Sequence, residues 1–188
     1  MICEVASCGS TIIEHLRTYI HVRGFIPSAA LAAVGYALLL RAHRSVWAFT
    51  IMVLPGTLAH EVSHFLVGLL FGAKPRGFSL RPQRSSKGWT LGTVSFGRIG
   101  VFNGAFVALA PILLLPLAWL CLMHLAVPAW VAGRWVMWLV AGYLIATAAF
   151  AGVPSWQDIK AGAPSLVVYL VVIVACWWTW PTVRSWIH

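Results

Sequence analysis

Long apolar runs separated by short polar segments dominate the pattern of this sequence. The apolar runs cover residues 25–40, 46–72, 100–126, 129–153 and 164–181. Because a helix needs about 20 mainly apolar residues to cross the hydrocarbon of a bilayer, the pattern predicts about five transmembrane helices. Only the region of Val127 and Pro128 separates the third run from the fourth. These two helices are therefore expected to form an antiparallel hairpin that turns there.

The longest polar segment, residues 73–99, carries a different periodicity. Residues 77–80 and 89–96 contain β-favouring side chains in partial alternation, and residues 84–88 between them favour a turn. This pattern predicts a β-hairpin against the membrane surface, with a disordered loop as the alternative. Ahead of the first apolar run, Thr11 and Glu14 have the spacing of a helical capping box. The residues after it predict an interfacial amphipathic helix, with a frayed polar leader as the alternative.

The expected fold class is therefore an all-α polytopic membrane protein with a small membrane-associated β-hairpin between its second and third transmembrane helices. Residues 1–188 are expected to form a single integral membrane domain. Within it, residues 1–24 are the amphipathic leader, residues 25–72 the first two spans, residues 73–99 the cytoplasmic hairpin loop and residues 100–181 three further spans.

Composition and charge support this class and give it an orientation. Of 188 residues, 61% are hydrophobic and 9% are charged, whereas about 25% of residues are charged in a typical soluble domain. The net charge of +9 would suit nucleic acid, but the basic residues lie between the apolar runs, as the positive-inside rule expects. Placing residues 73–99 in the cytoplasm leaves nine basic residues inside and four outside. We therefore expect no nucleic-acid partner, and an integral membrane protein whose N-terminus is cytoplasmic. The expected location is a bacterial inner membrane.

Ionisable residues inside the apolar runs are rare, and three of them lie together. The chain has four acidic residues, and Glu61 is in the second apolar run, within His60-Glu61-Val62-Ser63-His64. An ionisable residue at membrane depth is costly and indicates a functional site. Residues four apart share a face of a helix, so His60 and His64 can offer imidazole nitrogens to one ion.

Zinc-dependent hydrolysis is the chemistry that this motif indicates. It requires neutral imidazole ligands, an open coordination position and a carboxylate base. Glu61 lies about 100° around the helix from His60, so it can act on a water molecule without binding the metal. We therefore predict one Zn²⁺ per chain and Glu61 as the catalytic general base. The alternative is a pair of histidines that hydrogen-bond to neighbouring helices around a protonated Glu61.

A zinc site needs a third protein ligand, and Asp158 is the first candidate. It follows the fourth apolar run and is expected on the same side of the membrane as the histidines, where a break at Pro154 and Ser155 could turn its carboxylate toward the metal. An ordinary loop aspartate at a helix N-terminus is the alternative. His124 is the second candidate, although the expected topology places it toward the opposite side. Substrate-binding residues cannot be assigned from the pattern.

With these residues the chain resembles the site-2 protease family of intramembrane zinc metalloproteases. The matching segments are residues 59–64, 71–74, 92–96 and 108–113. The resemblance covers about residues 46–160, and the HExxH helix is its most specific part. It departs at the aspartate, because the family's usual motif places Asp before Gly in a stretch rich in Asn and Pro, whereas Ile159 follows Asp158 here.

The resemblance implies a function. It implies that His60, His64 and a later aspartate bind zinc, and that Glu61 is the general base. The implied partner is a membrane-protein or membrane-adjacent peptide substrate, unwound and added as a strand to the hairpin in residues 73–99. Two other functions stay open. One is a non-proteolytic metal-binding chaperone or partner-binding subunit of the same architecture, and the other is a small transporter, which five spans without an internal repeat fit poorly.

Overall fold

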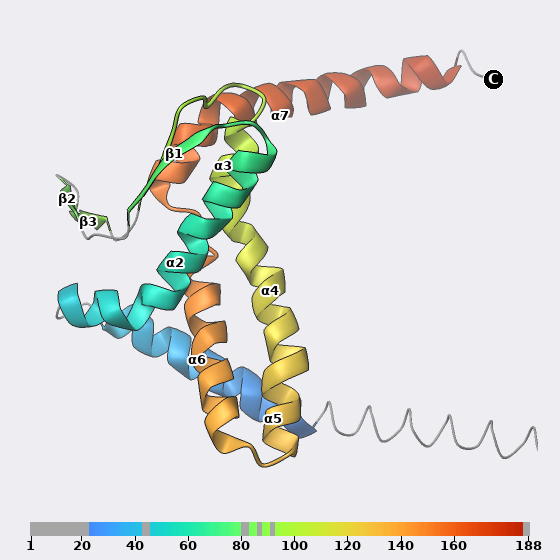
Figure 1. Cartoon of the computed structure of the whole chain (residues 1–188). Coiled ribbons are helices and arrows are strands. Elements are labelled where there is room, and N and C mark those ends of the chain that lie inside the picture. The colour runs from blue at the N-terminus through green and yellow to red at the C-terminus, as the bar shows by residue number, and fades with distance from the viewer. Residues whose placement is uncertain (1–22, 43–45, 80–82, 86–87, 91–92, 186–188) are drawn as a thin grey trace, which may run out of the picture. The chain divides into compact units, whose positions relative to one another are not determined.

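The structure, a computed structural model, describes residues 23–42, 46–79, 83–85, 88–90 and 93–185 (Figure 1). Most of these residues are helical, and two small antiparallel sheets lie in the chain between α2 (Val46–Leu70) and α3 (Gly104–Leu109). The expected amphipathic leader lies outside the described residues except for its last two positions. Contacts divide the chain into two compact units, Met1–Thr57 with Leu114–Gly152 and Leu58–Leu113 with Val153–His188.

Long apolar helices account for most of the described chain. Four of the helices among the described residues are long and apolar enough to cross a membrane: Arg23–Arg41, Phe49–Leu70, Gly104–Val131 and Trp156–Trp180. The predicted fourth span corresponds to α6 (Trp135–Ala151), a shorter apolar helix of 17 residues. Large apolar side chains are exposed on these helices, as Leu70 at 80% and Val136 at 77% illustrate. Such surfaces are typical of an integral membrane protein rather than a soluble one.

The predicted turn at Val127 and Pro128 is wrong. Helical residues continue through both positions. The consecutive segments are α3, a 3₁₀ turn (Ala110–Leu113), α4 (Leu114–Cys121), a π-helical turn (Leu122–Ala126) and α5 (Val127–Val131). Pro128 lies in the first turn of α5, a place where a proline is tolerated. The chain reverses at Gly133 instead, whose φ of 66° is a left-handed conformation that glycine adopts without strain.

In the first unit, α4 and the π-helical turn pack side by side with α6 (Figure 1), which confirms the predicted helical hairpin. The buried residues at its centre are mostly small or aliphatic: Ala118, Leu122, Ala126, Ala141 and Ile145. The helix Arg23–Arg41 packs on α6, because a Cβ on Gly142 would lie 2.3 Å from the Leu31 side chain. Between the same helices, the Trp138 indole N–H donates a 3.0 Å hydrogen bond to the Ser28 hydroxyl.

In the second unit, the predicted β-hairpin is confirmed. Strand β1 (Pro75–Ser79) pairs antiparallel with β4 (Thr93–Phe96), and β2 (Gln83–Ser85) pairs with β3 (Gly88–Thr90). The turn is shorter than residues 84–88, because Arg84 pairs with Trp89 within the β2–β3 ladder. Residues 86 and 87 lie outside the described residues. The hairpin lies against α2, since a Cβ on Gly68 would lie 2.4 Å from the Phe96 ring.

Hydrogen bonds at Gly72 and Asn103 close the end of α2 and link it to the start of α3. The end of α2 is closed at Gly72, which has a φ of 69°, by a 2.7 Å hydrogen bond from the Ala73 N–H to the Gly68 carbonyl. The Asn103 side-chain amide then donates hydrogen bonds to the carbonyls of Phe71 at 3.3 Å and Arg98 at 3.0 Å. Asn103 therefore ties the start of α3 to the end of α2.

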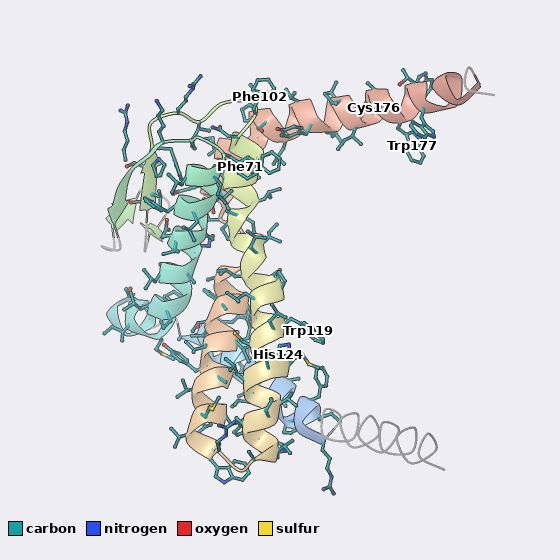
Figure 2. The ribbon with its side chains drawn as sticks, turned by 45° about the vertical axis from the view of Figure 1, so that its right-hand side comes forward. Phe71, Phe102, Trp119, His124, Cys176 and Trp177 are labelled. Carbon is teal, nitrogen blue, oxygen red and sulfur yellow. The ribbon has the colours of Figure 1, made fainter. Side chains whose placement is uncertain are left out.

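Helix α7 (Trp156–Ser185) packs against α3 at its N-terminal end. The Ser165 hydroxyl donates to the Val101 carbonyl at 2.6 Å, and the Tyr169 hydroxyl donates to the Phe102 carbonyl at 2.7 Å. Further along, Cys176 and Trp177 are exposed on the part of α7 beyond these contacts (Figure 2). The predicted start of this last span at residue 164 is wrong, because the helix begins at Trp156 and includes Asp158 in its first turn.

Candidate metal centre

Three side chains converge within the second unit. His60 and His64 lie on α2, and Asp158 comes from the first turn of α7. The Nε2 atoms of the two histidines are 3.1 Å apart. The Asp158 carboxylate lies 3.4 Å from His60 Nε2 through Oδ2 and 3.2 Å from His64 Nε2 through Oδ1. The structure thus brings together all three residues predicted as metal ligands.

Asp158 is held in place by its own helix terminus. The Ser155 backbone N–H donates a 2.7 Å hydrogen bond to Asp158 Oδ2, and the Asp158 N–H donates a 3.3 Å hydrogen bond to the Ser155 hydroxyl. This is the reciprocal arrangement of a capping box. Asp158 therefore caps the N-terminus of α7 and also faces the histidines. The sequence left these two roles as alternatives. The spacing of Ser155 and Asp158 is that of a capping box, so the role of Ser155 could have been predicted from the sequence.

His64 is oriented by a backbone carbonyl. Its Nδ1 lies 2.7 Å from the Val107 carbonyl oxygen on α3, in a buried contact. Because a carbonyl can only accept, Nδ1 must carry the proton, and Nε2 of the neutral ring then keeps its lone pair. This lone pair belongs to the nitrogen that approaches Asp158 and His60. No side-chain motif marks the Val107 carbonyl, so this contact could not be predicted from the sequence.

The donor set fits a zinc ion. A neutral His64 Nε2 and a carboxylate oxygen both present lone pairs, so a proton or a cation must lie between them. Zinc binds imidazole nitrogen and carboxylate oxygen at about 2.0–2.2 Å, which places tetrahedral ligands about 3.3–3.5 Å apart. The separations of 3.1, 3.2 and 3.4 Å are close to this spacing. The side chains of His60, His64 and Asp158 are 14%, 6% and 18% exposed, so little solvent competes for the ion.

Glu61 is a buried acid beside the three converging residues. Its residue exposure is 7%, and it lies close enough to His60, His64 and Asp158 for electrostatic interaction with each of them. Among the residues that the structure describes, none donates a hydrogen bond to its carboxylate. A carboxylate in this setting is available to exchange a proton with a water molecule or a substrate.

His124, the second candidate ligand, is not part of this cluster. It lies in the π-helical turn within the first unit and is exposed (Figure 2). The cluster of His60, His64 and Asp158 lies entirely within the second unit. Of the two candidates for the third ligand, Asp158 is therefore the one that lies beside His60 and His64.

No protein-family model, curated protein or solved structure matches this chain. The resemblance to site-2 proteases therefore stays a prediction from the motifs.

Enlarging Gly162 should displace Asp158 from the histidines. Gly162 lies one helical turn after Asp158, and a Cβ there would meet the Ala108 Cβ at 2.4 Å and the Gly104 carbonyl oxygen at 3.1 Å. Neither group can rotate away, so Gly162→Val should push the start of α7 from α3. We expect zinc affinity to fall by about 10–100-fold, the range for disturbed supporting contacts of metal ligands. Competition with a chromophoric chelator measures this affinity.

Gly100→Ala is the matched control for this substitution. Nothing lies within 4 Å of a Cβ built at Gly100, and no left-handed φ constrains it. The control should therefore bind zinc as the wild-type chain does. Equal zinc affinity of the Gly162→Val and Gly100→Ala variants would show that the α3–α7 contact does not set the position of Asp158.

Proposed function

We propose that this chain is a zinc-dependent intramembrane endopeptidase, which hydrolyses a peptide bond in or near a transmembrane segment of its substrate. The observation that carries the proposal is the meeting of His60, His64 and Asp158 from two apolar helices, next to the buried Glu61. A purely structural histidine pair would not need a carboxylate opposite its Nε2 atoms. It would also not need a second buried acid without a hydrogen-bond donor among the described residues.

Each residue of the site has a role in this reaction. His60 and His64 would hold the ion through Nε2, and Asp158 through a carboxylate oxygen. Zinc, when bound, polarises the substrate carbonyl and lowers the pKa of water. The Glu61 carboxylate takes a proton as the water oxygen bonds to the carbonyl carbon, and it gives that proton to the leaving nitrogen as the C–N bond breaks. Burial of Glu61 keeps this proton from exchanging with bulk solvent.

The hairpin supports an extended substrate. Within the described residues, β1 and β4 pair only with each other, so each strand has a second edge that no described strand occupies. A substrate segment could pair with such an edge as an added strand. This mode would suit the chemistry, because the backbone groups of an unwound segment are no longer hydrogen-bonded within a helix.

The proposed protein crosses the membrane five times. With 17 residues, α6 is about 25 Å long and lies at the short end of the range for a spanning helix. Counting α6, we infer five spans, with the N-terminus and the hairpin on the cytoplasmic side of a bacterial inner membrane. The distribution of basic residues supports this orientation.

Removal of the metal tests the proposed activity. The purified full chain should contain one zinc ion and should generate new N-termini within transmembrane segments when it is mixed with detergent-solubilised bacterial membrane proteins. Chelation with 1,10-phenanthroline should abolish these cleavages, and added Zn²⁺ should restore them. Labelling of new N-termini followed by mass spectrometry measures the result. A zinc-loaded chain that produces no zinc-dependent N-termini would contradict the protease assignment and favour a non-proteolytic metal protein.

A further inference from the structure

The Val107 carbonyl accepts two hydrogen bonds, and neither comes from the residue four positions later. One comes from His64 Nδ1 at 2.7 Å, and the other comes from the Ala110 backbone N–H. In a continuous α-helix this carbonyl would accept the N–H of the residue four positions later, which is residue 111. Residue 111 is proline, which has no N–H and whose ring also crowds the carbonyl four residues before it.

We propose that Pro111 is a positioning residue for the metal centre. Because Pro111 supplies no N–H, no bond from residue 111 draws the Val107 carbonyl into line with the helix axis, and the oxygen stays directed at His64. For zinc binding the inference depends on the proposed metal site, but the hydrogen bond itself does not. Two observations support it: the helix tightens into a 3₁₀ turn at Ala110–Leu113, where the donor is missing, and Pro111 is fully buried.

The consequence is a fixed ring orientation for His64. With Nδ1 donating to Val107, Nε2 is the nitrogen with the lone pair, and it points toward Asp158 Oδ1 at 3.2 Å. An N–H at position 111 would bond to the same carbonyl and draw it back along the helix axis, away from His64 Nδ1. His64 would then have a buried N–H without a partner, and its ring could flip or exchange tautomers.

The test compares two variants that both lack the proline ring and differ at the N–H. Pro111→Ala adds an N–H at position 111, whereas the α-hydroxy analogue of alanine at the same position has an ester oxygen in its place. We expect the dissociation constant for Zn²⁺ to rise by about 10–100-fold in Pro111→Ala and to stay within a few-fold of wild type in the α-hydroxy variant. Pro116→Ala is the control, because Pro116 is an exposed proline of α4. It should bind Zn²⁺ as wild type does.

A measurement without metal separates this inference from the proposed activity. Nitrogen-15 spectra of the metal-free chain in detergent micelles, at alkaline pH, should show His64 protonated at Nδ1 in wild type. Pro111→Ala should show a mixture of both tautomers. The inference is overturned if Pro111→Ala keeps the wild-type tautomer and zinc affinity, or if the α-hydroxy variant loses zinc as strongly as Pro111→Ala. Should Pro111→Ala not fold, the α-hydroxy variant decides alone, because its loss of zinc would overturn the inference and its retention would support it.

Discussion

Replacing Glu61 with glutamine is expected to reduce peptide cleavage by about 10²–10⁴-fold, the range for the loss of a general acid–base group. Glutamine keeps the shape of the side chain, but its amide cannot take a proton from water. Zinc content should stay at one ion per chain, because Glu61 is not among the three converging side chains. The rate constant for a cleavage found by N-terminal labelling, together with elemental analysis of the same sample, checks both expectations.

The matched control is Glu14→Gln, which makes the same chemical change outside the described residues. It should leave cleavage and zinc content at wild-type levels. Full cleavage by a zinc-loaded Glu61→Gln variant would rule out Glu61 as the base. Loss of zinc together with cleavage would instead place Glu61 among the ligands. Either result would require a different division of roles from the one that the geometry supports.

The part of the site that lies on one helix could be predicted from the sequence. His60 and His64 are one turn apart, so the helical repeat alone places both side chains on one face. The same holds for the apolar helices, because their length and composition are local properties. It also holds for the hairpin between β1 and β4, whose strands and turn residues lie within one short segment.

Residues that depend on the start of a helix or on long-range packing were harder to predict. The apolar pattern predicts a loop at Asp158 before the last span, whereas the capping box with Ser155 starts α7 at Trp156. In the same helix, Gly162 packs closely against Ala108, a contact between residues far apart in the sequence. A pattern of apolar residues contains neither the cap nor the contact.

Prolines gave the least reliable signals. Pro128 suggested a turn, but it is accommodated in a continuing helix and the chain reverses at Gly133. Pro111 suggested only a family-like pattern of small residues and proline, although it lies four residues after the Val107 carbonyl that accepts from His64. In both places the structural effect of the proline depends on whether the helix needs a backbone N–H at that position.

Asp158→Asn is expected to lower zinc affinity by more than about 100-fold, beyond the range for disturbed supporting contacts. Asparagine can still accept the hydrogen bond from the Ser155 N–H, so the start of α7 should survive. It cannot supply the negative charge that lies 3.2 Å and 3.4 Å from the two histidine nitrogens. Competition with a chromophoric chelator gives the affinity, and circular dichroism confirms that the helices remain.

Ser155→Ala separates the ligand role of Asp158 from its role as a helix cap. It removes the hydroxyl that accepts the Asp158 N–H but keeps the carboxylate and the Ser155 backbone N–H that holds it. The loss of half a cap costs about 1 kcal/mol of helix stability, and zinc affinity should change by only a few-fold. If both variants lose zinc equally, the site depends on where α7 begins. A loss confined to Asp158→Asn shows that the carboxylate itself binds the ion.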